Sequence, residues 1–242
     1  MSMVDLELDD GVAVVTINRP EARNAIAPAT MDALDKTLDA AEGARVLVVT
    51  GAGDRAFVSG GDLKELAAIR TEDEATAMAM RMRGICDRIA AFPGPVVAAL
   101  NGHALGGGAE VAVAADIRVA ADDIKIGFNQ TALAIMPAWG GAERLAALVG
   151  RGRALMLAGT GSVLTAAEAE RHGLVDLLLP RAAFAEGWRT LAKSLATDAA
   201  GEIKKVMGGS LSAEEAARCF ARLWVDDAHW DAADRVLSRT KR

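Results

Sequence analysis

The chain has 242 residues, of which 52% are hydrophobic and 25% charged, so it can bury a sizeable core as one large domain or as a domain with a small appendage. Its formal net charge of −6 argues against binding to nucleic acid, which requires a basic face. No apolar run approaches the ~18 consecutive residues of a membrane span, so we expect no membrane segment.

The cysteines and the first residues indicate a compartment. Cys86 and Cys219 are far apart and form no CxxC pair, which predicts reduced thiols. Residues 1–10 are acidic and lack the apolar run of a signal peptide. We therefore expect a soluble protein of the cytoplasm.

Short apolar runs with strand spacing recur through the first half of the chain. The first alternates apolar with acidic side chains, and the later ones are nearly continuous apolar runs, as in buried strands. They occupy residues 4–8, 12–17, 46–49, 95–100 and 116–120. Helical patterns lie between several of them, so the alternation predicts an α/β fold.

Capping signals indicate where several helices begin. A Ser or Thr followed three residues later by Glu forms a capping box, in which each side chain binds the other residue's backbone N–H. Such pairs occur at Thr71/Glu74, Thr165/Glu168 and Ser212/Glu215. The pattern becomes mainly helical after residue 139. We expect an α/β core at residues 1–200 and a C-terminal helical region at 201–242.

The C-terminal region carries Trp224 and Trp230 on a helical pattern with an apolar face. Such a face needs a partner. That partner is either a neighbouring subunit or the remainder of this chain, and the sequence leaves both alternatives open.

Two glycine-rich segments, residues 56–66 and 101–110, stand out as candidates for chemistry. Each follows a predicted strand and leads into a predicted helix. Glycine allows a ligand to approach the backbone closely, and the first turn of a helix has unpaired N–H groups. Two such turns that face one pocket could hold a single oxyanion, each donor contributing ~3 kcal/mol in the transition state.

A structural explanation of the same residues is also open. Asp62 and Glu65 fit the start of a helix, the glycines at 106–108 fit close packing, and Glu110 suits the dipole of a first helical turn. Neither segment has the Gly-Lys-Ser/Thr ending of a Walker A loop, and neither gives GxGxxG. A site for ATP or a dinucleotide is therefore not expected.

Taken together, the segments resemble the crotonase superfamily, also called the enoyl-CoA hydratase/isomerase family. Five stretches match that family in order: INRP at 17–20 with NA at 24–25, AFVSGGDLKEL at 56–66, NGHALGGGAE at 101–110 with Asp116, PAWGG at 137–141 with RL at 144–145, and LTAAEA at 164–169 with GLV at 173–175. The resemblance implies an α/β fold, a crotonase-like spiral of β-β-α turns with a C-terminal helical region. It also implies a homotrimer or a dimer of trimers.

The resemblance carries specific roles onto this sequence. It places the two oxyanion-hole N–H groups on Gly61 and Gly107. The backbone near Ala56, Val58 and Gly61 would line the adenine pocket, and Arg23 lies where family members approach the phosphates of coenzyme A. Coenzyme A enters as part of an acyl-CoA substrate, so no separate cofactor is expected.

The catalytic carboxylates of the family are only half present. Glu110 matches the first one, just after the triple glycine. The second would lie seven residues before Pro137, where this chain has Gln130, which we place in the substrate site. Glutamine cannot exchange a proton near neutral pH as glutamate does. Trp139 is a second departure, since hydratases typically have a small residue there.

Three functions follow as hypotheses from this mixed pattern. The first is an acyl-CoA enzyme that hydrates or isomerises an enoyl-CoA by stabilising a thioester enolate. The second is a decarboxylase of a branched malonyl-CoA, which needs the oxyanion hole and a single proton donor. The third is a non-catalytic acyl-CoA-binding protein, suggested by the missing glutamate.

A metal site is not expected. His103, His172 and His229 show no metal-ligand spacing, and no Cys/His cluster accompanies them. His103 lies beside the glycines and is expected to be a packed loop residue, with contact to the substrate as the alternative.

Overall fold

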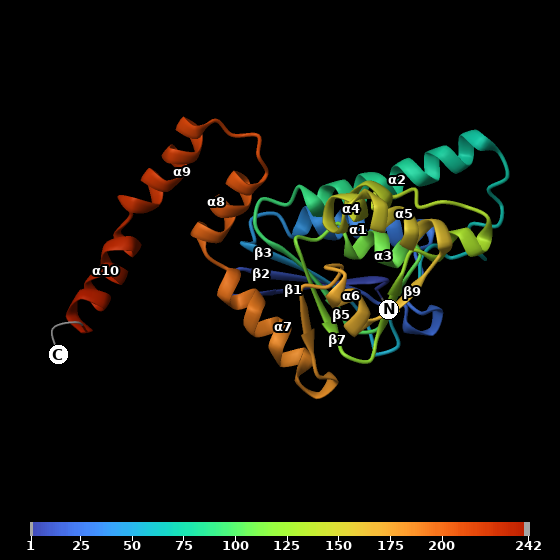
Figure 1. The fold of residues 1–242 in the computed structure, drawn as a ribbon, viewed down its shortest axis with the longest axis horizontal. Helices are drawn as coiled ribbons and strands as arrows, with labels where there is room; N and C mark the ends of the chain where they lie inside the picture. The colour runs from blue at the N-terminus through green and yellow to red at the C-terminus, as the bar shows by residue number, and fades with distance from the viewer. Residues whose placement is uncertain (1, 240–242) are drawn as a thin grey trace.

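A computed structural model describes residues 2–239. Its larger sheet has six strands in the order β1-β2-β3-β5-β7-β10 (Figure 1). The pair β1–β2 is antiparallel, and every other neighbouring pair is parallel. The strands are β1 (Val4–Asp9), β2 (Val12–Ile17), β3 (Val46–Gly51), β5 (Val96–Leu100), β7 (Ile117–Ala121) and β10 (Leu177–Leu179). Every residue of β3 and β5 is buried, as expected for central parallel strands covered on both faces.

A second sheet of four strands builds the site. Its order is β4 (Ala56–Val58), β6 (His103–Leu105), β8 (Lys125–Gly127) and β9 (Val163–Thr165). Three times in succession, the chain adds one strand to the large sheet, then one to the small sheet, then a helix, as β3-β4-α2, β5-β6-α3 and β7-β8-α4. This arrangement is the spiral of β-β-α turns that the resemblance implied. Strands of three residues are too short to show a period in the sequence.

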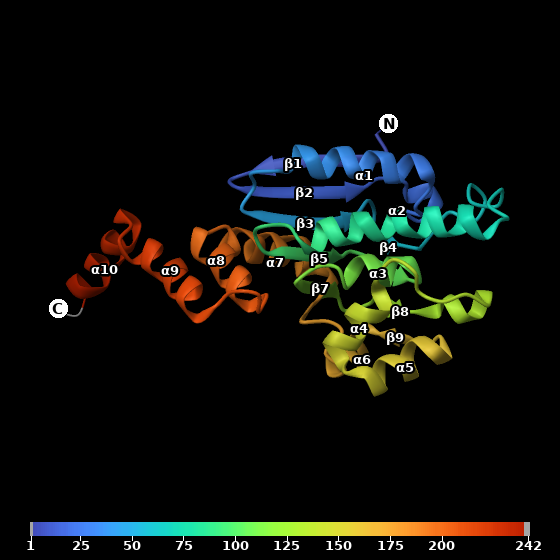
Figure 2. The same cartoon turned by 90° about the horizontal axis from the view of Figure 1, so that it is seen from above.

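Helices enclose the large sheet. In Figures 1 and 2, α1 and α2 lie side by side along one side of it, whereas α7 crosses the other side. The helices of the body are α1 (Pro28–Ala40), α2 (Glu72–Ala90), α3 (Gly107–Ala112), α4 (Gly141–Val149), α5 (Arg151–Thr160), α6 (Ala166–Arg171), α7 (Arg181–Leu195) and α8 (Asp198–Met207). Short 3-10 helices occupy Pro20–Ala22 and Asn129–Leu133.

The capping boxes predicted at Thr71/Glu74, Thr165/Glu168 and Ser212/Glu215 are all formed. The expectation of a helix after Gly61 is wrong. Residues 63–68 form consecutive turns, and Oδ1 of Asp62 accepts the N–H groups of Lys64 and Glu65 at 3.2 and 3.4 Å. Asp62 thus caps a turn, and its second oxygen pairs with Arg19 at 3.0 Å.

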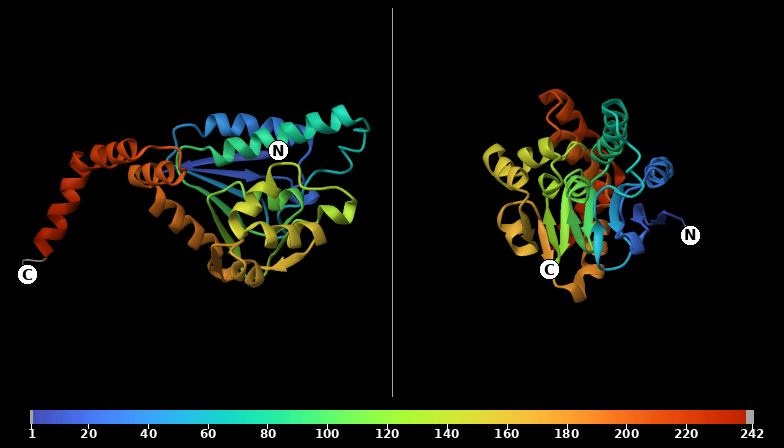
Figure 3. Two further views of the ribbon diagram at one scale, coloured as in Figure 1. Left: turned by 45° about the horizontal axis from the view of Figure 1, so that its top comes forward. Right: turned by 90° about the vertical axis from the view of Figure 1, so that its right-hand side faces the viewer.

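The last two helices extend away from this body (Figures 1 and 3). They are α9 (Ala213–Trp224) and α10 (Asp227–Arg239). Trp224 and Trp230 contact each other with ring centroids 5.6 Å apart, yet they remain 46% and 49% exposed. No helix within residues 2–239 is long and apolar enough to cross a membrane.

Candidate active site

The structure brings the two glycine-rich segments into direct backbone contact. Strands β4 and β6 pair in parallel, with Val58 opposite Ala104, so the residues that follow them run side by side. A Cβ built on Gly60 would lie 3.3 Å from the N of Gly107. One built on Gly108 would lie 2.6 Å from the carbonyl carbon of Val58, closer than real Cβ contacts allow. The approach of the two segments therefore requires glycine at 108.

The N–H groups of Gly61 and Gly107 both lie at this junction. Gly107 is the first residue of α3, where a helix leaves its N–H groups without internal partners. Gly61 bridges to Ile26, but that bridge uses the carbonyl of Gly60 and the N–H of Asp62. Neither glycine N–H donates to an acceptor within residues 2–239.

The side chain of Trp139 packs against both glycines. A Cβ built on Gly107 would overlap its indole ring, lying 2.8 Å from Cε3 and closer still to two other ring atoms. A Cβ built on Gly61 would be 3.9 Å from Cζ2 of the same ring. Trp139 is only 6% exposed, so the absence of a side chain at Gly107 is what admits the ring, whereas a Cβ at Gly61 would only touch it.

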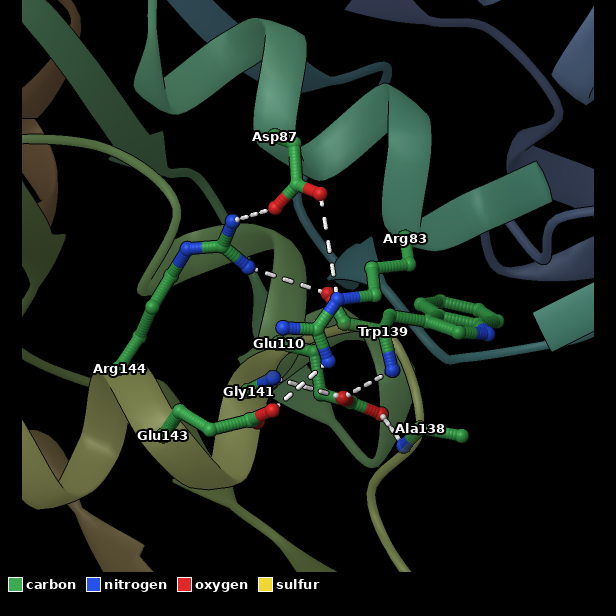
Figure 4. A network of polar contacts seen from close by, with 8 residues as sticks. All are labelled: Arg83, Asp87, Glu110, Ala138, Trp139, Gly141, Glu143 and Arg144. Carbon is green, nitrogen blue, oxygen red and sulfur yellow. Dashed lines mark hydrogen bonds and ion pairs between the residues drawn. The ribbon is translucent and has the colours of Figure 1, made fainter. Parts of the chain in front are cut away.

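The carboxylate of Glu110 is buried inside the loop that carries Trp139 (Figure 4). Its Oε2 accepts the backbone N–H groups of Trp139 at 2.7 Å and of Gly141 at 3.0 Å. Its Oε1 accepts the N–H of Ala138 at 3.3 Å and the Nε2 of Gln130 at 2.9 Å. At 2% exposure, Glu110 is enclosed by the groups it binds and fixes the shape of residues 138–141.

Burial raises the pKa of the Glu110 carboxyl above its ordinary value, although the four hydrogen bonds act in the opposite direction. Removal from water disfavours the charged form, whereas N–H donors favour it. A carboxyl with a raised pKa keeps its proton at a higher pH than an exposed glutamate. Such a group is suited to deliver or receive a proton.

Gln130 lies in the 3-10 helix Asn129–Leu133 and is 7% exposed. Because it donates Nε2 to Glu110, its amide orientation is set by that carboxylate. Its Oε1 is buried without a hydrogen-bond partner among the described residues. A buried acceptor without a donor is unfavourable by ~1–3 kcal/mol, so this oxygen is available to a donor that enters the site.

Charged residues hold the outer side of the same loop (Figure 4). Arg144 donates Nη1 to the carbonyl of Trp139 at 3.1 Å and also pairs with Asp87 on α2. Arg83 on α2 pairs with Glu143 at 2.7 Å. The loop is thus held by Glu110 from the inside and by α2 from the outside.

Cys86 lies on the inner face of α2 and is not a nucleophile. Burial raises the pKa of its thiol to about 12, and the charge of Glu110 acts in the same direction. The thiol is therefore protonated near neutral pH, and only the thiolate reacts. Both Cys86 and Cys219 are free and buried, in agreement with the predicted reduced thiols.

A cavity of about 490 Å³ opens beside the junction of the glycine segments. Two of the predicted substrate residues, Arg23 and Ala56, line it, together with Ser59 and Leu105. Val58 is fully buried and is not part of the lining. Gly61, Gly107, Glu110 and Gln130 are not part of it either, so the predicted residues divide into a cavity group and a buried group.

Other residues of the cavity were not predicted as a binding group. They are Asp54, Arg55, His103, Asp123, Ile124 and Arg181. His103 is exposed rather than packed, and its Nδ1 accepts the N–H of Lys125 at 3.0 Å. These residues come from separate parts of the chain and form no motif, so only the folded chain groups them. No group of residues within 2–239 could hold a metal ion.

Comparisons with known proteins identify the family and the fold. The family model described as enoyl-CoA hydratase/isomerase matches residues 7–222. A short-chain-enoyl-CoA hydratase from Clostridium acetobutylicum is 35% identical over 207 residues, covering 84% of this chain and 79% of that protein. A crotonyl-CoA hydratase from Syntrophomonas wolfei is 32% identical over 236 residues, covering 96% and 85%. The crystal structure of an enoyl-CoA hydratase from Thermoplasma volcanium superposes with a TM-score of 0.86 at 32% identity, covering 97% of each chain.

Proposed function

The chain belongs to the enoyl-CoA hydratase/isomerase family, and from this we propose that it converts an acyl-CoA thioester through an enolate held by the N–H groups of Gly61 and Gly107. The observation that carries the proposal is the pair of free N–H groups on two adjoining segments. Fixed donors stabilise negative charge as it develops on the thioester oxygen, and each contributes ~3 kcal/mol.

The residues that line the cavity support the proposal that the CoA portion of the substrate binds there. Arg23 and Arg55 line it, and neither forms an ion pair with a described residue, so both are available to phosphates. The cavity also reaches Ser59 and Leu105, each two residues before one of the two glycines. Coenzyme A is part of the substrate in this proposal, and no separate cofactor is needed.

We propose hydration or isomerisation of an enoyl-CoA as the reaction, with Glu110 as the acid–base group. Hydration adds water across the carbon–carbon double bond, so one group must take a proton from water and a proton must reach carbon. Isomerisation moves one proton between two carbons and needs only one group. Within the part of the chain that the structure describes, Glu110 is the only acidic side chain that hydrogen-bonds to the loop 138–141.

Decarboxylation of a branched malonyl-CoA is a second candidate, favoured by the hydrogen bond from Gln130 to Glu110. In that reaction the bond between the carboxylate and the α-carbon breaks, CO₂ leaves, and the electron pair forms the enolate. A single proton transfer to the α-carbon then completes it. Only one proton-carrying group is required, and Gln130 cannot be a second.

One experiment separates these reactions. The protein is incubated with crotonyl-CoA and ethylmalonyl-CoA together, and the CoA products are identified by mass spectrometry. Gain of water by crotonyl-CoA supports hydration, and loss of CO₂ from ethylmalonyl-CoA supports decarboxylation. Binding of both thioesters without any product would favour the non-catalytic protein and contradict an enzyme. Glu110→Gln is the matched control for a proton-transfer role.

We also propose that the C-terminal region of residues 201–242 mediates self-association into a trimer or a dimer of trimers. The extended position of α9 and α10 and the exposed rings of Trp224 and Trp230 support this (Figure 1). Light scattering on the full chain and on Trp224→Ala/Trp230→Ala tests it. A monomer in the unchanged chain would contradict it.

A further inference from the structure

The indole of Trp139 fills the space on one side of the glycine junction. It packs on the backbone of Gly107, and it reaches within 3.9 Å of a Cβ built on Gly61. The same built Cβ would lie 2.9 Å from Cδ1 of Leu66. The side of the junction facing these two side chains is therefore occupied by apolar groups rather than by open space.

Both backbone polar groups of Trp139 are held by hydrogen bonds. Its N–H donates to Oε2 of Glu110 at 2.7 Å, and its carbonyl accepts Nη1 of Arg144 at 3.1 Å. Arg144 is in turn paired with Asp87 on α2. These contacts fix the backbone of Trp139, and the ring itself, only 6% exposed, is held by the packing around it, so it forms a wall on this side of the junction.

The open volume lies elsewhere. The cavity of about 490 Å³ is lined by Ser59 and Leu105 but not by Gly61, Gly107 or Trp139. A thioester whose oxygen is bound by the two glycine N–H groups therefore has room for its CoA portion in the cavity. Its acyl carbons leave the thioester carbon on the other side from the sulfur of CoA, and so away from this cavity.

We propose that Trp139 determines acyl-chain specificity by closing the acyl end of the site, so that short acyl-CoA thioesters bind and longer ones are excluded. The inference rests on the proposed function, because it assumes that the thioester oxygen lies at the two N–H groups. In a closed apolar pocket, one methylene too many changes recognition ~10-fold or more. Longer acyl chains are rejected by contact with the ring.

Binding of saturated thioesters tests the proposal without dependence on the reaction. Isothermal titration calorimetry compares CoA, butyryl-CoA and octanoyl-CoA on the full chain, on Trp139→Ala and on Trp139→Phe. The matched control is Trp188→Phe, which removes the same atoms from a tryptophan in α7 that is 3% exposed. Circular dichroism verifies that each variant is folded.

We expect the unchanged protein to bind octanoyl-CoA at least ~10-fold more weakly than butyryl-CoA. Trp139→Ala should abolish or reverse that preference, Trp139→Phe should give an intermediate ratio, and Trp188→Phe should leave it unchanged. Equal binding of the two thioesters by the unchanged chain overturns the role of Trp139 while leaving the proposed function standing. The same holds if the ratio is unaltered in Trp139→Phe. If neither CoA nor any thioester binds, the proposed function is wrong and this inference fails with it.

Discussion

Nε2 of Gln130 lies 2.9 Å from Oε1 of Glu110, so the buried carboxylate of the site is bound by a side chain that cannot take its proton. The remaining contacts of Glu110 are backbone N–H groups of the loop 138–141. The same carboxylate therefore shapes the loop and, among residues 2–239, is the only acidic side chain that hydrogen-bonds to it. Changes at these two residues separate the structural role from the chemical one.

Glu110→Gln should reduce both turnover and stability. An amide cannot carry the proton, so we expect kcat to fall ~10²-fold or more, with thioester binding retained. Every partner of Glu110 is an N–H donor, so the amide NH₂ faces donors in either orientation. The free energy of unfolding should fall by ~1–3 kcal/mol. Kinetics and urea unfolding measure the two effects, with the exposed Glu186→Gln on α7 as the control. Unchanged turnover would make Glu110 purely structural.

Gln130→Glu should place a second carboxyl beside Glu110. Two carboxylates at this distance cannot both ionise, so the pair should share a proton and one apparent pKa should rise well above the usual range. We expect the variant to lose stability relative to the unchanged chain as the pH rises. Hydration of crotonyl-CoA should increase, because a second proton carrier is then present. Gln130→Leu, which has no proton to exchange, should not increase hydration; an equal gain in both variants would refute this explanation.

The pH dependence of the reaction should follow Glu110. Burial holds the pKa of this carboxyl above the ~4.3 of an unperturbed glutamate. Turnover that needs its proton, as in decarboxylation, should fall as the pH rises through the raised pKa. Turnover that needs it as a base should rise over the same range. Profiles of kcat against pH distinguish the acid role from the base role. If the same pH dependence persists in Glu110→Gln, it comes from another group.

The free energy of unfolding should also depend on pH through Glu110, and the direction of that dependence follows from its raised pKa. The pKa of Glu110 is higher in the folded than in the unfolded chain, so the folded state binds more protons between the two values. Its contribution is therefore full below the unfolded pKa and is lost as the pH rises through the folded pKa. The difference in unfolding free energy between the unchanged chain and Glu110→Gln should shrink as the pH rises above the ~4.3 of an unperturbed glutamate. A difference that grows over this range would contradict the raised pKa.

Gly107→Ala should disturb the glycine junction. The new Cβ would overlap the buried ring of Trp139, and relief of that overlap should lower the free energy of unfolding by ~1–3 kcal/mol. A displaced Gly107 N–H should also lower kcat by ~10²-fold or more. Gly84→Ala is the matched control, because its Cβ meets nothing within 4 Å inside α2 and should stabilise by ~0.5–1 kcal/mol. The stability cost of Gly107→Ala should be smaller in a Trp139→Ala background than in the unchanged chain, because the ring that the new Cβ meets is then absent; an equal cost in both backgrounds would show that another contact is responsible.

Arg23→Ala should weaken binding of the CoA portion. Arg23 lines the cavity without an ion pair among the described residues, so its loss should raise KM and leave kcat nearly unchanged. The effect should be smaller at high ionic strength, because salt screens an exposed charge. Arg218→Ala, on α9 and paired with Glu214, is the control. An equal effect of the two substitutions would mean that Arg23 has no specific contact with the substrate.

Much of the fold could be predicted because the signals are local. The capping boxes at Thr71/Glu74 and Thr165/Glu168 involve residues three positions apart, so the sequence contains the whole interaction. Long buried strands such as residues 95–100 show their apolar character without any partner. The helix expected after Gly61 is wrong because a single acidic residue caps a turn as readily as a helix.

The sequence by itself determined the α/β alternation, the two glycine-rich segments and the acidic residue at 110, since these depend on neighbouring positions and on matched motifs. Only the tertiary structure decided what those residues contact. The second sheet has strands too short to show a period, and it is this sheet that brings residue 58 against residue 108. The four hydrogen bonds on Glu110 and the placement of Trp139 against both glycines join positions up to 78 residues apart, from 61 to 139. Contacts of that range depend on packing of the whole chain, which no local pattern records.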